Sequence, residues 1–415
     1  MAGESGRASA RPLRVCIISE DFPGERGCGG IGTYTHVLAR GLASLGHRVH
    51  VVTRTWGDAN VEEADGVRVH RVPVPEPSWR RGTRVATARF WETLHILRWN
   101  LAVRGVVKRI ASADGLDVIE SPEYRAQGLL TAIAHRRFPL VVRLHGSSYY
   151  ARSIGGIGLG WSRADTVLAE RLECELGRRA RLVVAASRPL AEQVKRAWRL
   201  GAGKIRLVPL PMDTDVFLPR TGTVLDDGTI LYVGRISLLK GVDTLIEALP
   251  AIREACPGAR LRLVGKEDPW PGGGRSTADE LRRRLGDAGV PESVVEFRKP
   301  VARSALPDVY QAAAVCVIPS PAGSSGYTCL EAMASGCAVV ATAFGPGHVY
   351  LTHERDGLLV PPRSPQALAS AVVRLLANPG LRRQLADVGR KAVRERFGSA
   401  VIGAETALAY RSLLA

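Results

Sequence analysis

Short apolar runs alternate with amphipathic segments along most of the 415-residue chain. Apolar runs of about four to eight residues are typical of strands that are buried on both faces of a parallel sheet. Apolar residues at helical spacing, such as Val37, Leu38, Leu42 and Leu45, indicate helices between these strands. The predicted buried strands form two series: 15–19, 49–53, 117–120, 140–144 and 182–187, then 230–233, 260–264, 294–297, 315–318 and 338–342.

This order of strands and helices predicts an α/β protein with two doubly wound parallel sheets. One hydrophobic core stops growing at about 250–300 residues, so the chain is long enough for two domains. We expect a first domain over 12–210 and a second over 211–395, because three prolines punctuate the polar stretch 208–220 between the two series. The remaining segment, 396–415, lies beyond the needs of the second sheet and is predicted to be helical over 400–414.

The cysteines indicate a reducing compartment. Their number is odd, and none forms a C-x-x-C pair, which argues against a disulfide framework and a zinc site. The apolar run 15–18 is too short for the core of a signal peptide, and no segment approaches about 18 consecutive apolar residues. These features predict a cytoplasmic protein. The seven cysteines are at positions 16, 28, 174, 256, 316, 329 and 337.

The net charge of +17 is uneven along the chain. Residues 1–210 hold 33 Lys and Arg against 19 Asp and Glu, a net charge of +14, and residues 211–415 hold the remaining +3. A basic half can face nucleic acid, an anionic membrane or an acidic acceptor. No recognisable nucleic-acid module accompanies the charge, so we expect no nucleic-acid partner.

Segment 79–110 carries much of this charge and leaves two interpretations open. Phe90, Leu94, Leu97 and Leu101 fall on one helical face, and Glu92 is the only acid in the segment. Such a helix either lies on an anionic membrane, on the inner face as a peripheral protein, or packs its apolar stripe on the sheet. Its cations are Arg80, Arg81, Arg84, Arg89, Arg98, Arg104, Lys108 and Arg109.

Two cations stand out after the predicted strand 230–233. Arg235 and Lys240 are five residues apart at the start of an amphipathic helix. A diphosphate leaving group gains negative charge as its glycosidic bond breaks, so fixed cations beside it favour the transition state. The alternative is an exposed helix start with incidental cations.

A second loop follows the predicted strand 315–318 and opens a helix that runs to about Ala334. Free N–H groups at such a helix start bind phosphate without any side-chain charge. Loops at the carboxyl ends of neighbouring parallel strands line one crevice. The candidate donor-binding residues here are Ser324, Ser325, Gly326, Tyr327, Thr328 and, one turn into the helix, Glu331.

These segments resemble the donor-binding half of the retaining GT-B glycosyltransferases of the GT4 family. The shared patterns are Gly-Arg-x4-Lys-Gly over 234–241 and Pro-Ser followed by Glu331-Ala-Met-Ala. The resemblance continues through Gly29-Gly-Ile-Gly32, Leu144-His-Gly146 and Val208-Pro209, in the family's order. It implies two Rossmann-like domains around a deep cleft, with the C-terminal helix crossing back to the first domain.

The resemblance also implies roles for individual residues. Glu331 would accept hydrogen bonds from the donor's ribose, His145 would touch the donor sugar, and Gly29 and Gly30 would lie beside the donor phosphate and the acceptor. Arg235 and Lys240, with His145, are the catalytic candidates. A structural role is the alternative in each case: Glu331 as a first-turn glutamate that complements the helix dipole, His145 as a core histidine, and the glycines as a plain βα turn.

The chain departs from the family at two sugar-facing positions. Gly323 stands where the family has the first Glu of its E-x7-E pair, and His348 and Val349 replace Pro-Glu in a later loop. Both departures leave the donor sugar open. Asp213-Thr-Asp215 matches a D-x-D metal motif, but it lies in the linker, follows no strand end and is interpreted as a turn.

Together these features predict a metal-independent retaining glycosyltransferase without a cofactor. It would move a sugar from a nucleotide-diphosphate sugar in the second domain to a hydroxyl of a glycolipid, polysaccharide or natural product in the first. Two alternatives remain at this point: a non-catalytic relative that binds nucleotide sugar, for which Gly323 is the motive, and a sugar-nucleotide epimerase of the same architecture.

Overall fold

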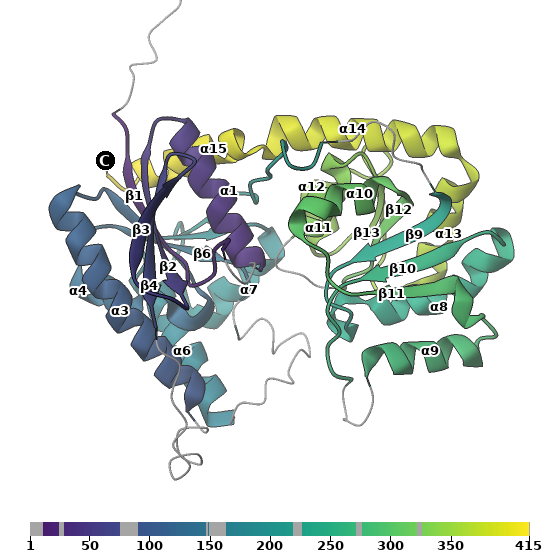
Figure 1. Ribbon diagram of the computed structural model, residues 1–415, viewed down its shortest axis with the longest axis horizontal. Helices are drawn as coiled ribbons and strands as arrows, with labels where there is room; N and C mark the ends of the chain where they lie inside the picture. The colour runs from purple at the N-terminus through teal and green to yellow at the C-terminus, as the bar shows by residue number, and fades with distance from the viewer. Residues whose placement is uncertain are drawn as a thin grey trace, which may run out of the picture.

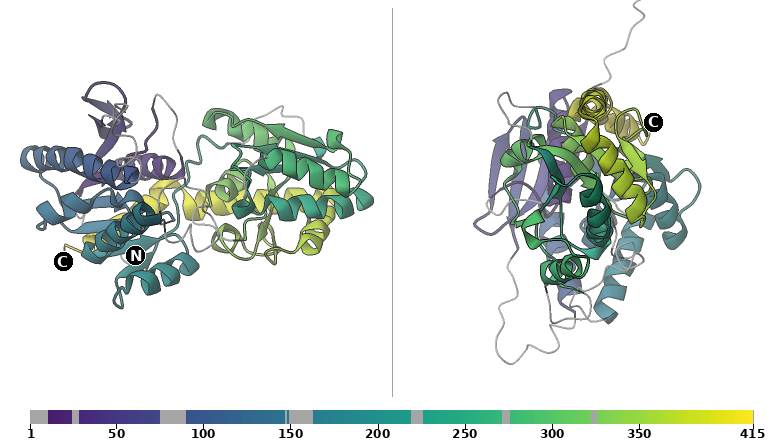
Figure 2. Two further views of the ribbon diagram at one scale, coloured as in Figure 1. Left: turned by 90° about the horizontal axis from the view of Figure 1, so that it is seen from below. Right: turned by 90° about the vertical axis from the view of Figure 1, so that its right-hand side faces the viewer.

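The computed structural model describes residues 11–24, 29–74, 90–146, 148, 163–218, 226–270, 276–321 and 326–414. It contains two β-sheets, each flanked by helices on both faces, and the two units lie beside each other along the long axis (Figures 1 and 2). The predicted α/β architecture with two Rossmann-like domains is confirmed.

The first sheet has eight strands, and all its neighbouring pairs are parallel except β3 with β4. In spatial order the strands are β3 (Asn60–Ala64), β4 (Val67–Pro73), β2 (Arg48–Thr55), β1 (Arg14–Ile18), β5 (Val118–Pro122), β6 (Leu140–Leu144), β7 (Leu182–Ala185) and β8 (Ile205–Leu207). Its helices are α1 (Gly30–Ser44), α3 (Trp91–Ala113), α4 (Leu129–Ala134), α6 (Arg163–Arg179) and α7 (Arg188–Trp198).

The side chains of the central strand β1 point alternately to the two faces of the sheet, and different helices cover each face. Val15 and Ile17 of β1 join one core with Leu38 and Leu42 of α1. Cys16 and Ile18 join the opposite core, together with α3, α4, α6 and α7. Successive side chains of a strand point to opposite faces, so one continuous apolar run serves both layers.

The hairpin of β3 and β4 was not predicted. Every residue of β3 is exposed, so the strand lacks the apolar alternation on which the prediction depends. Its turn carries a recognisable signal, because Asp65 and Gly66 both adopt positive φ angles, 53° and 74°. Asp-Gly is a preferred pair for tight hairpin turns of this kind.

The second sheet has six strands and is entirely parallel. In spatial order they are β11 (Val295–Arg298), β10 (Arg260–Val264), β9 (Asp226–Val233), β12 (Ala313–Ile318), β13 (Ala338–Thr342) and β14 (Leu358–Val360). Its helices are α8 (Val242–Ala255), α9 (Thr277–Asp287), α10 (Leu306–Gln311), α11 (Tyr327–Ala334), α12 (Pro346–Tyr350), α13 (Pro365–Ala377) and α14 (Pro379–Phe397).

Helix α14 leads directly into α15 (Ser399–Arg411), which returns to the first unit, as Figures 1 and 2 show. The crossing helix is therefore confirmed. It packs on α1, where Gly41 meets the backbone of Ser399 so closely that a Cβ atom at Gly41 would lie 2.3 Å from the Ser399 carbonyl oxygen. A glycine at this position allows the two backbones to touch.

A buried carboxylate holds the returning helix in place. The Tyr410 hydroxyl of α15 donates to Glu120 Oε2 at 2.6 Å, and the Tyr34 hydroxyl of α1 donates to Oε1 at 2.8 Å. All three side chains are buried, and burial raises the pKa of Glu120. The two hydroxyls satisfy a polar group that would otherwise be costly to bury.

Several predicted boundaries were wrong by a few residues. Strand 182–187 ends at Ala185, because Ser187 is the N-cap of α7 and its hydroxyl accepts from the Leu190 amide at 3.4 Å. The helix that carries Val37, Leu38 and Leu42, which its apolar spacing predicts over 33–45, begins at Gly30, because the glycines form its first turn.

Helix α3 packs on the sheet with a face that the sequence did not single out. Ile96, Trp99 and Val103 are buried against the sheet, whereas Leu97 and Leu101 are 41 % and 57 % exposed. The proposed packing of the Phe90–Leu101 stripe on the sheet is therefore wrong for most of that stripe. Residues 79–89 of the predicted basic segment lie outside the described residues.

No described helix could cross a bilayer, and even α3, the longest with 23 residues, lacks a sufficiently long apolar window. Six of the seven cysteines lie in the described ranges, and all six are free thiols.

We predict that Tyr410→Phe lowers the free energy of unfolding by about 1.5–3 kcal/mol, because a hydrogen bond to a buried carboxylate is lost. Denaturant unfolding of the full chain measures this change. Leu408→Ala, at an exposed position of the same helix, is the matched control and should change stability by less than about 0.5 kcal/mol. Equal stability of Tyr410→Phe and the unsubstituted protein would show that Glu120 does not anchor α15.

Candidate active site

The loops after β9 and β12 meet at one edge of the second sheet, because the two strands are parallel neighbours. The first loop carries Arg235 and a 3₁₀ turn, Leu238–Lys240. Gly241 follows with a φ of 70° and packs on the second loop, where a Cβ atom would lie 2.2 Å from the Pro319 carbonyl oxygen. This close contact at Gly241 keeps the preceding residue, Lys240, beside the segment that leads to α11.

The two predicted cations differ in exposure. The Arg235 side chain is 68 % exposed and donates through Nε to Asp268 Oδ1 at 2.9 Å. Lys240 is partly buried, and its pKa is lowered first by burial and then by the neighbouring Arg235 charge. A bound anion would oppose both effects, because a negative charge nearby favours the charged form of Lys240. Asp268, which follows β10, was not predicted from the sequence.

Helix α11 begins beside the same loop. The Thr328 hydroxyl donates to the Val233 carbonyl at 3.3 Å, which ties the first turn of α11 to the end of β9. Glu331, one turn further, is buried and accepts from the Tyr310 hydroxyl at 3.0 Å. Burial raises the pKa of Glu331, and the nearby Arg303 opposes that shift.

The remaining donor-side candidates are only partly described. Gly326 is the N-cap of α11 and Tyr327 is its first residue, with a buried side chain. Gly323, Ser324 and Ser325 lie outside the described residues.

Across from α11, the glycine-rich loop of the first unit begins helix α1. Asp21 places its carboxylate at this helix start, where Oδ2 accepts from the Gly29 amide at 2.7 Å and from the Gly32 amide at 3.4 Å. Gly29 and Gly30 are both exposed. The role of Asp21 was missed, although its position just beyond the first strand was a usable signal.

His145 follows β6 and lies in a buried setting. Its amide donates to Glu123 Oε1 at 2.7 Å, and its ring meets Tyr34 edge-on with 4.7 Å between the centroids. Burial, assisted by the nearby Arg143 charge, lowers the pKa of His145 to about 3. The imidazole is therefore neutral at pH 7.

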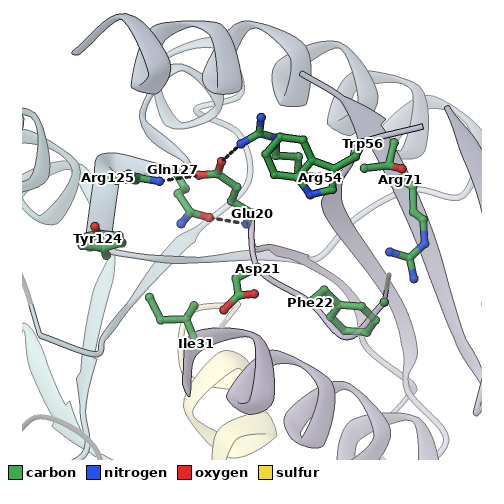
Figure 3. Close-up of a pocket in the computed structure, with 12 residues that line it drawn as sticks. Glu20, Asp21, Phe22, Ile31, Arg54, Trp56, Arg71, Tyr124, Arg125 and Gln127 are labelled. Atoms are coloured by element: carbon green, nitrogen blue, oxygen red, sulfur yellow. Dashed lines mark hydrogen bonds and ion pairs between the residues drawn. The ribbon is translucent and has the colours of Figure 1, made fainter. Parts of the chain in front are cut away.

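A pocket of about 370 Å³ opens at the carboxyl edge of the first sheet (Figure 3). Its walls come from the ends of β1, β2, β4 and β5 and from the start of α1. The pocket was not predicted from the sequence, although most lining residues follow predicted strands. They are Glu20, Asp21, Phe22, Gly24, Ile31, Arg54, Thr55, Trp56, Arg71, Tyr124, Arg125 and Gln127.

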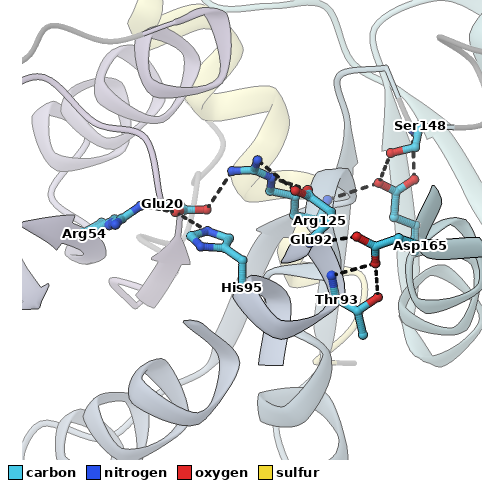
Figure 4. A network of polar contacts seen from close by, with 9 residues as sticks. Glu20, Arg54, Glu92, Thr93, His95, Arg125, Ser148 and Asp165 are labelled. Carbon is cyan, nitrogen blue, oxygen red and sulfur yellow. Dashed lines mark hydrogen bonds and ion pairs between the residues drawn. The ribbon is translucent and has the colours of Figure 1, made fainter. Parts of the chain in front are cut away.

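Arg125 is held in this wall by three carboxylates (Figure 4). Its Nε donates to Glu92 Oε1 at 2.5 Å, Nη1 lies 3.6 Å from Glu20 Oε2, and its amide donates to Glu173 Oε1 at 3.1 Å. Its φ of 60° is left-handed, a conformation that costs a non-glycine residue about 1–3 kcal/mol. Such strain persists only where surrounding contacts enforce it, and it is concentrated at functional sites.

Two buried carboxylates lie behind the His145 loop. Glu123 accepts from the amides of His145 and Gly146, and Glu173 accepts from the amide and hydroxyl of Ser148. Burial raises the pKa of Glu123 to about 7. Burial, with the Glu123 charge as a further cause, raises the pKa of Glu173 to about 8.

The D-x-D segment is tied to the protein rather than aimed at a strand end. Asp213 Oδ2 accepts from Arg40 Nη1 at 2.7 Å, and its Oδ1 accepts from the Val216 amide at 3.4 Å. Across the described ranges, no three His, Cys, Asp or Glu side chains come together in a way that could hold a metal ion.

The structure thus brings Arg235, Lys240 and the start of α11 together at one sheet edge. His145 and the glycine-rich loop lie in the first unit, and Tyr34 connects them by packing on His145 from α1. Tyr34 of the first unit and Tyr327 of the second belong to one continuous hydrophobic core, which links the two halves.

Comparison with known proteins identifies both halves. Residues 28–216 match the family model described as Glycosyltransferase Family 4, and residues 227–378 match that described as Glycosyl transferases group 1. The D-inositol 3-phosphate glycosyltransferase of Kribbella flavida is 32 % identical to this chain, with 97 % of this chain and 96 % of the relative covered.

Two solved structures extend the comparison. Sucrose-phosphate synthase from Thermosynechococcus elongatus is 26 % identical with a TM-score of 0.73, over 97 % of this chain and 99 % of that one. Anabaena Alr3699/HepE, solved in complex with UDP-glucose, is 20 % identical with a TM-score of 0.66, over 96 % and 100 % of the two chains, and shows the same fold.

We predict that Glu123→Gln flattens the pH dependence of stability. The folded pKa values of Glu123 and Glu173 lie above the usual glutamate value, so the folded state keeps protons that the unfolded chain releases above about pH 4.3. The free energy of unfolding should therefore fall between about pH 5 and pH 8. Relative to the unsubstituted protein, Glu123→Gln should gain on the order of 1–3 kcal/mol more at pH 8.5 than at pH 5.

Thermal melts of both proteins at the two pH values measure this difference. The exposed carboxylate Glu63 provides the control, since Glu63→Gln should shift both melts equally. A Glu123→Gln variant that is destabilised equally at both pH values would mean that Glu123 is ionised throughout.

Proposed function

The chain belongs to the group 1, family 4 glycosyltransferases, and we propose that it moves a sugar from a nucleotide-diphosphate sugar to an acceptor hydroxyl with retention of anomeric configuration and without a metal. The family gives the transferase activity. The donor, the stereochemistry and the metal independence are the proposal.

One observation carries it: Arg235 and Lys240 meet the start of α11 at a single sheet edge. Amide groups at a helix start favour a phosphate group, and two fixed cations beside them suit a diphosphate. As the bond to the sugar breaks, the charge on the leaving diphosphate grows, and cations that are already in place stabilise it without reorganisation.

In this proposal, Glu331 binds the nucleoside end of the donor. Its carboxylate lies one turn inside α11 and is braced by the Tyr310 hydroxyl, so it can accept from ribose hydroxyls without changing its position. The Asp268 carboxylate holds Arg235 at the rim, and we expect it to yield to the donor phosphate or to share the guanidinium with it.

The low pKa of His145 favours a mechanism in which the leaving group, rather than a protein base, takes the acceptor's proton. With a pKa of about 3, the imidazole is a weak proton acceptor at neutral pH. In the proposed mechanism, the acceptor's proton passes to the departing phosphate oxygen on the same face of the sugar, while neutral His145 donates or accepts one hydrogen bond to the donor sugar. This would leave the anomeric configuration unchanged.

The first domain then holds the acceptor, and closure of the two halves excludes the water that would hydrolyse the donor. The Kribbella relative's name makes D-inositol 3-phosphate the first acceptor to try. Because UDP-glucose is the ligand of the Anabaena protein, it is the first donor to try.

The intact cation pair and Glu331 favour an active transferase over a non-catalytic binder. Release of free nucleotide diphosphate together with a new glycoside would exclude an epimerase.

The test uses UDP-, GDP-, ADP- and dTDP-sugars with EDTA or Mg²⁺. A ligand at about a hundred times its Kd adds about 2.7 kcal/mol of stability, so one nucleotide sugar should raise Tm clearly and equally with either additive. We predict that Lys240→Ala lowers the turnover of that donor about 10²–10³-fold, because a charge that stabilises the leaving group is lost.

Lys391→Ala, at an exposed lysine of α14, is the control and should keep full turnover. Near-normal turnover of Lys240→Ala would remove Lys240 from the phosphate site. A rate that EDTA abolishes and Mg²⁺ restores would contradict the metal-independent mechanism.

We also propose that α3 brings the protein to an anionic membrane surface. Phe90, Leu97 and Leu101 are 42 %, 41 % and 57 % exposed, and they lie on the face of the helix that is not packed on the sheet. Exposed cations surround them, and the single acid of the helix is buried. The cations are Arg98, Arg104, Lys108 and Arg109.

We predict that replacing Leu97 and Leu101 together with serine lowers binding to phosphatidylglycerol vesicles at least fivefold, because apolar area that enters the interface is lost. Vesicle co-sedimentation at low and high salt measures it. Leu408→Ser, at an exposed leucine of α15, should bind like the unsubstituted protein. Absence of binding to these vesicles, or equal binding of the double variant, would contradict membrane contact through α3.

A further inference from the structure

We propose that the pocket at the carboxyl edge of the first sheet selects an uncharged saccharide or polyol acceptor, which stacks on Trp56 and is held by Glu20 and Asp21. This inference rests on the proposed transferase function and specifies its acceptor. It separates this chain from relatives whose named acceptor carries a phosphate.

Every arginine in the pocket wall already has a carboxylate partner. Arg54 Nη1 lies 3.1 Å from Glu20 Oε1, and Arg71 donates through Nε and Nη2 to Glu62 Oε1 at 2.9 and 2.7 Å. Arg125 donates to both oxygens of Glu92, at 2.5 and 3.1 Å.

A phosphate that entered the described pocket would therefore find no uncompensated guanidinium. To bind there, it would have to compete with a carboxylate for each arginine. A strong anion site needs cations that are not already paired with protein carboxylates.

The Asp21 carboxylate would also repel a phosphate, whereas Glu20 is already paired with Arg54, Arg125 and His95. Glu20 and Asp21 both line the pocket, and Figure 3 shows their carboxylates between Tyr124 on one side and Trp56 on the other. The hydrogen bonds described for the Asp21 carboxylate fall on Oδ2, where two amides of the α1 start donate. Carboxylate oxygens accept hydrogen bonds, and the hydroxyl groups of an uncharged sugar supply donors for them.

Trp56 supplies the apolar part of such a site. It is 44 % exposed although it lies at the end of a buried strand, and the Arg54 guanidinium sits 3.7 Å from its ring centroid. This contact fixes the ring against the pocket wall. A rigid aromatic face beside carboxylates suits a sugar ring, which has an apolar C–H face and a polar hydroxyl edge.

The wall is held in shape before any ligand arrives. Arg125 keeps its left-handed backbone through contacts to Glu92, Glu20 and Glu173, and the Gln127 side chain accepts from the Glu20 amide at 2.7 Å. The volume of about 370 Å³ is near the lower end of small-molecule sites, about 300–1,000 Å³, which suits one or two sugar rings.

The test compares matched acceptors that differ only in a phosphate: D-glucose with D-glucose 6-phosphate, and myo-inositol with D-inositol 3-phosphate. Release of nucleotide diphosphate above the rate with water alone is measured with the donor that the thermal panel identifies. We expect at least one uncharged member to exceed its phosphorylated partner tenfold or more in kcat/KM. Preference for the phosphorylated members, or no use of any uncharged member, would overturn the proposal.

Two variants test the named groups. Trp56→Ala should raise KM for the uncharged acceptor at least tenfold with little change in the donor's KM, and Trp56→Phe should recover most of that loss because the aromatic face remains. Glu62→Gln frees Arg71 from its partner and should shift the ratio of kcat/KM severalfold toward the phosphorylated acceptor. An unchanged acceptor KM in Trp56→Ala, or an unchanged ratio in Glu62→Gln, would overturn the corresponding part of the proposal.

A separate measurement distinguishes this inference from the transferase function. Saturation-transfer NMR with methyl α-D-glucopyranoside and, in parallel, D-glucose 6-phosphate requires no donor and no turnover. Signals from the uncharged glycoside that vanish in Trp56→Ala would support the pocket even if no donor bound. Signals from the phosphorylated sugar alone would refute the inference while leaving sugar transfer intact.

Discussion

The architecture depends on one buried carboxylate with two donors from distant parts of the chain. Glu120 lies on β5 in the interior of the first sheet, and it accepts hydrogen bonds from Tyr34 of the first helix and Tyr410 of the last. Because burying an unsatisfied carboxylate is costly, the last helix has to return across the molecule to complete the first domain. The same Tyr34 packs on His145, so this structural anchor lies against the candidate catalytic residue.

The donor side and the acceptor side of the site differ in how their charged groups are balanced. On the donor side, Lys240 is disfavoured as a cation by burial and by Arg235, so an anionic ligand improves its surroundings. On the acceptor side, cations and acids neutralise one another before a ligand binds, and what remains is a surface of hydrogen-bonding groups beside an aromatic ring. The donor side therefore suits a ligand with two phosphates, and the acceptor side suits an uncharged ligand.

Much of this could be predicted from the sequence, because the signals were local. Buried parallel strands appear as apolar runs, and the Gly-Arg-x4-Lys-Gly spacing fixed Arg235 and Lys240 at the end of one of them. The second loop and Glu331 followed from the same reasoning.

The acceptor pocket was not predictable in this way, because its geometry depends on pairs far apart in the chain. Arg125 is held by Glu92 and Glu173, and Arg71 by Glu62 on a strand whose exposed residues show no alternation. Nothing in the spacing of these residues indicates which acid meets which arginine. The sequence shows that Gly323 stands where the family has a glutamate. It does not show which group makes the glutamate's contact instead.

The return of α15 has a consequence for how the protein is made. A growing chain ordinarily folds its first domain while the second is still being synthesised. Here all eight strands of the first sheet emerge early, but the Tyr410 hydroxyl that satisfies Glu120 is added only after the whole second sheet has been made. The first domain therefore remains incomplete while the whole second domain is synthesised, and until α15 is made it exposes the apolar residues of α1 that α15 covers.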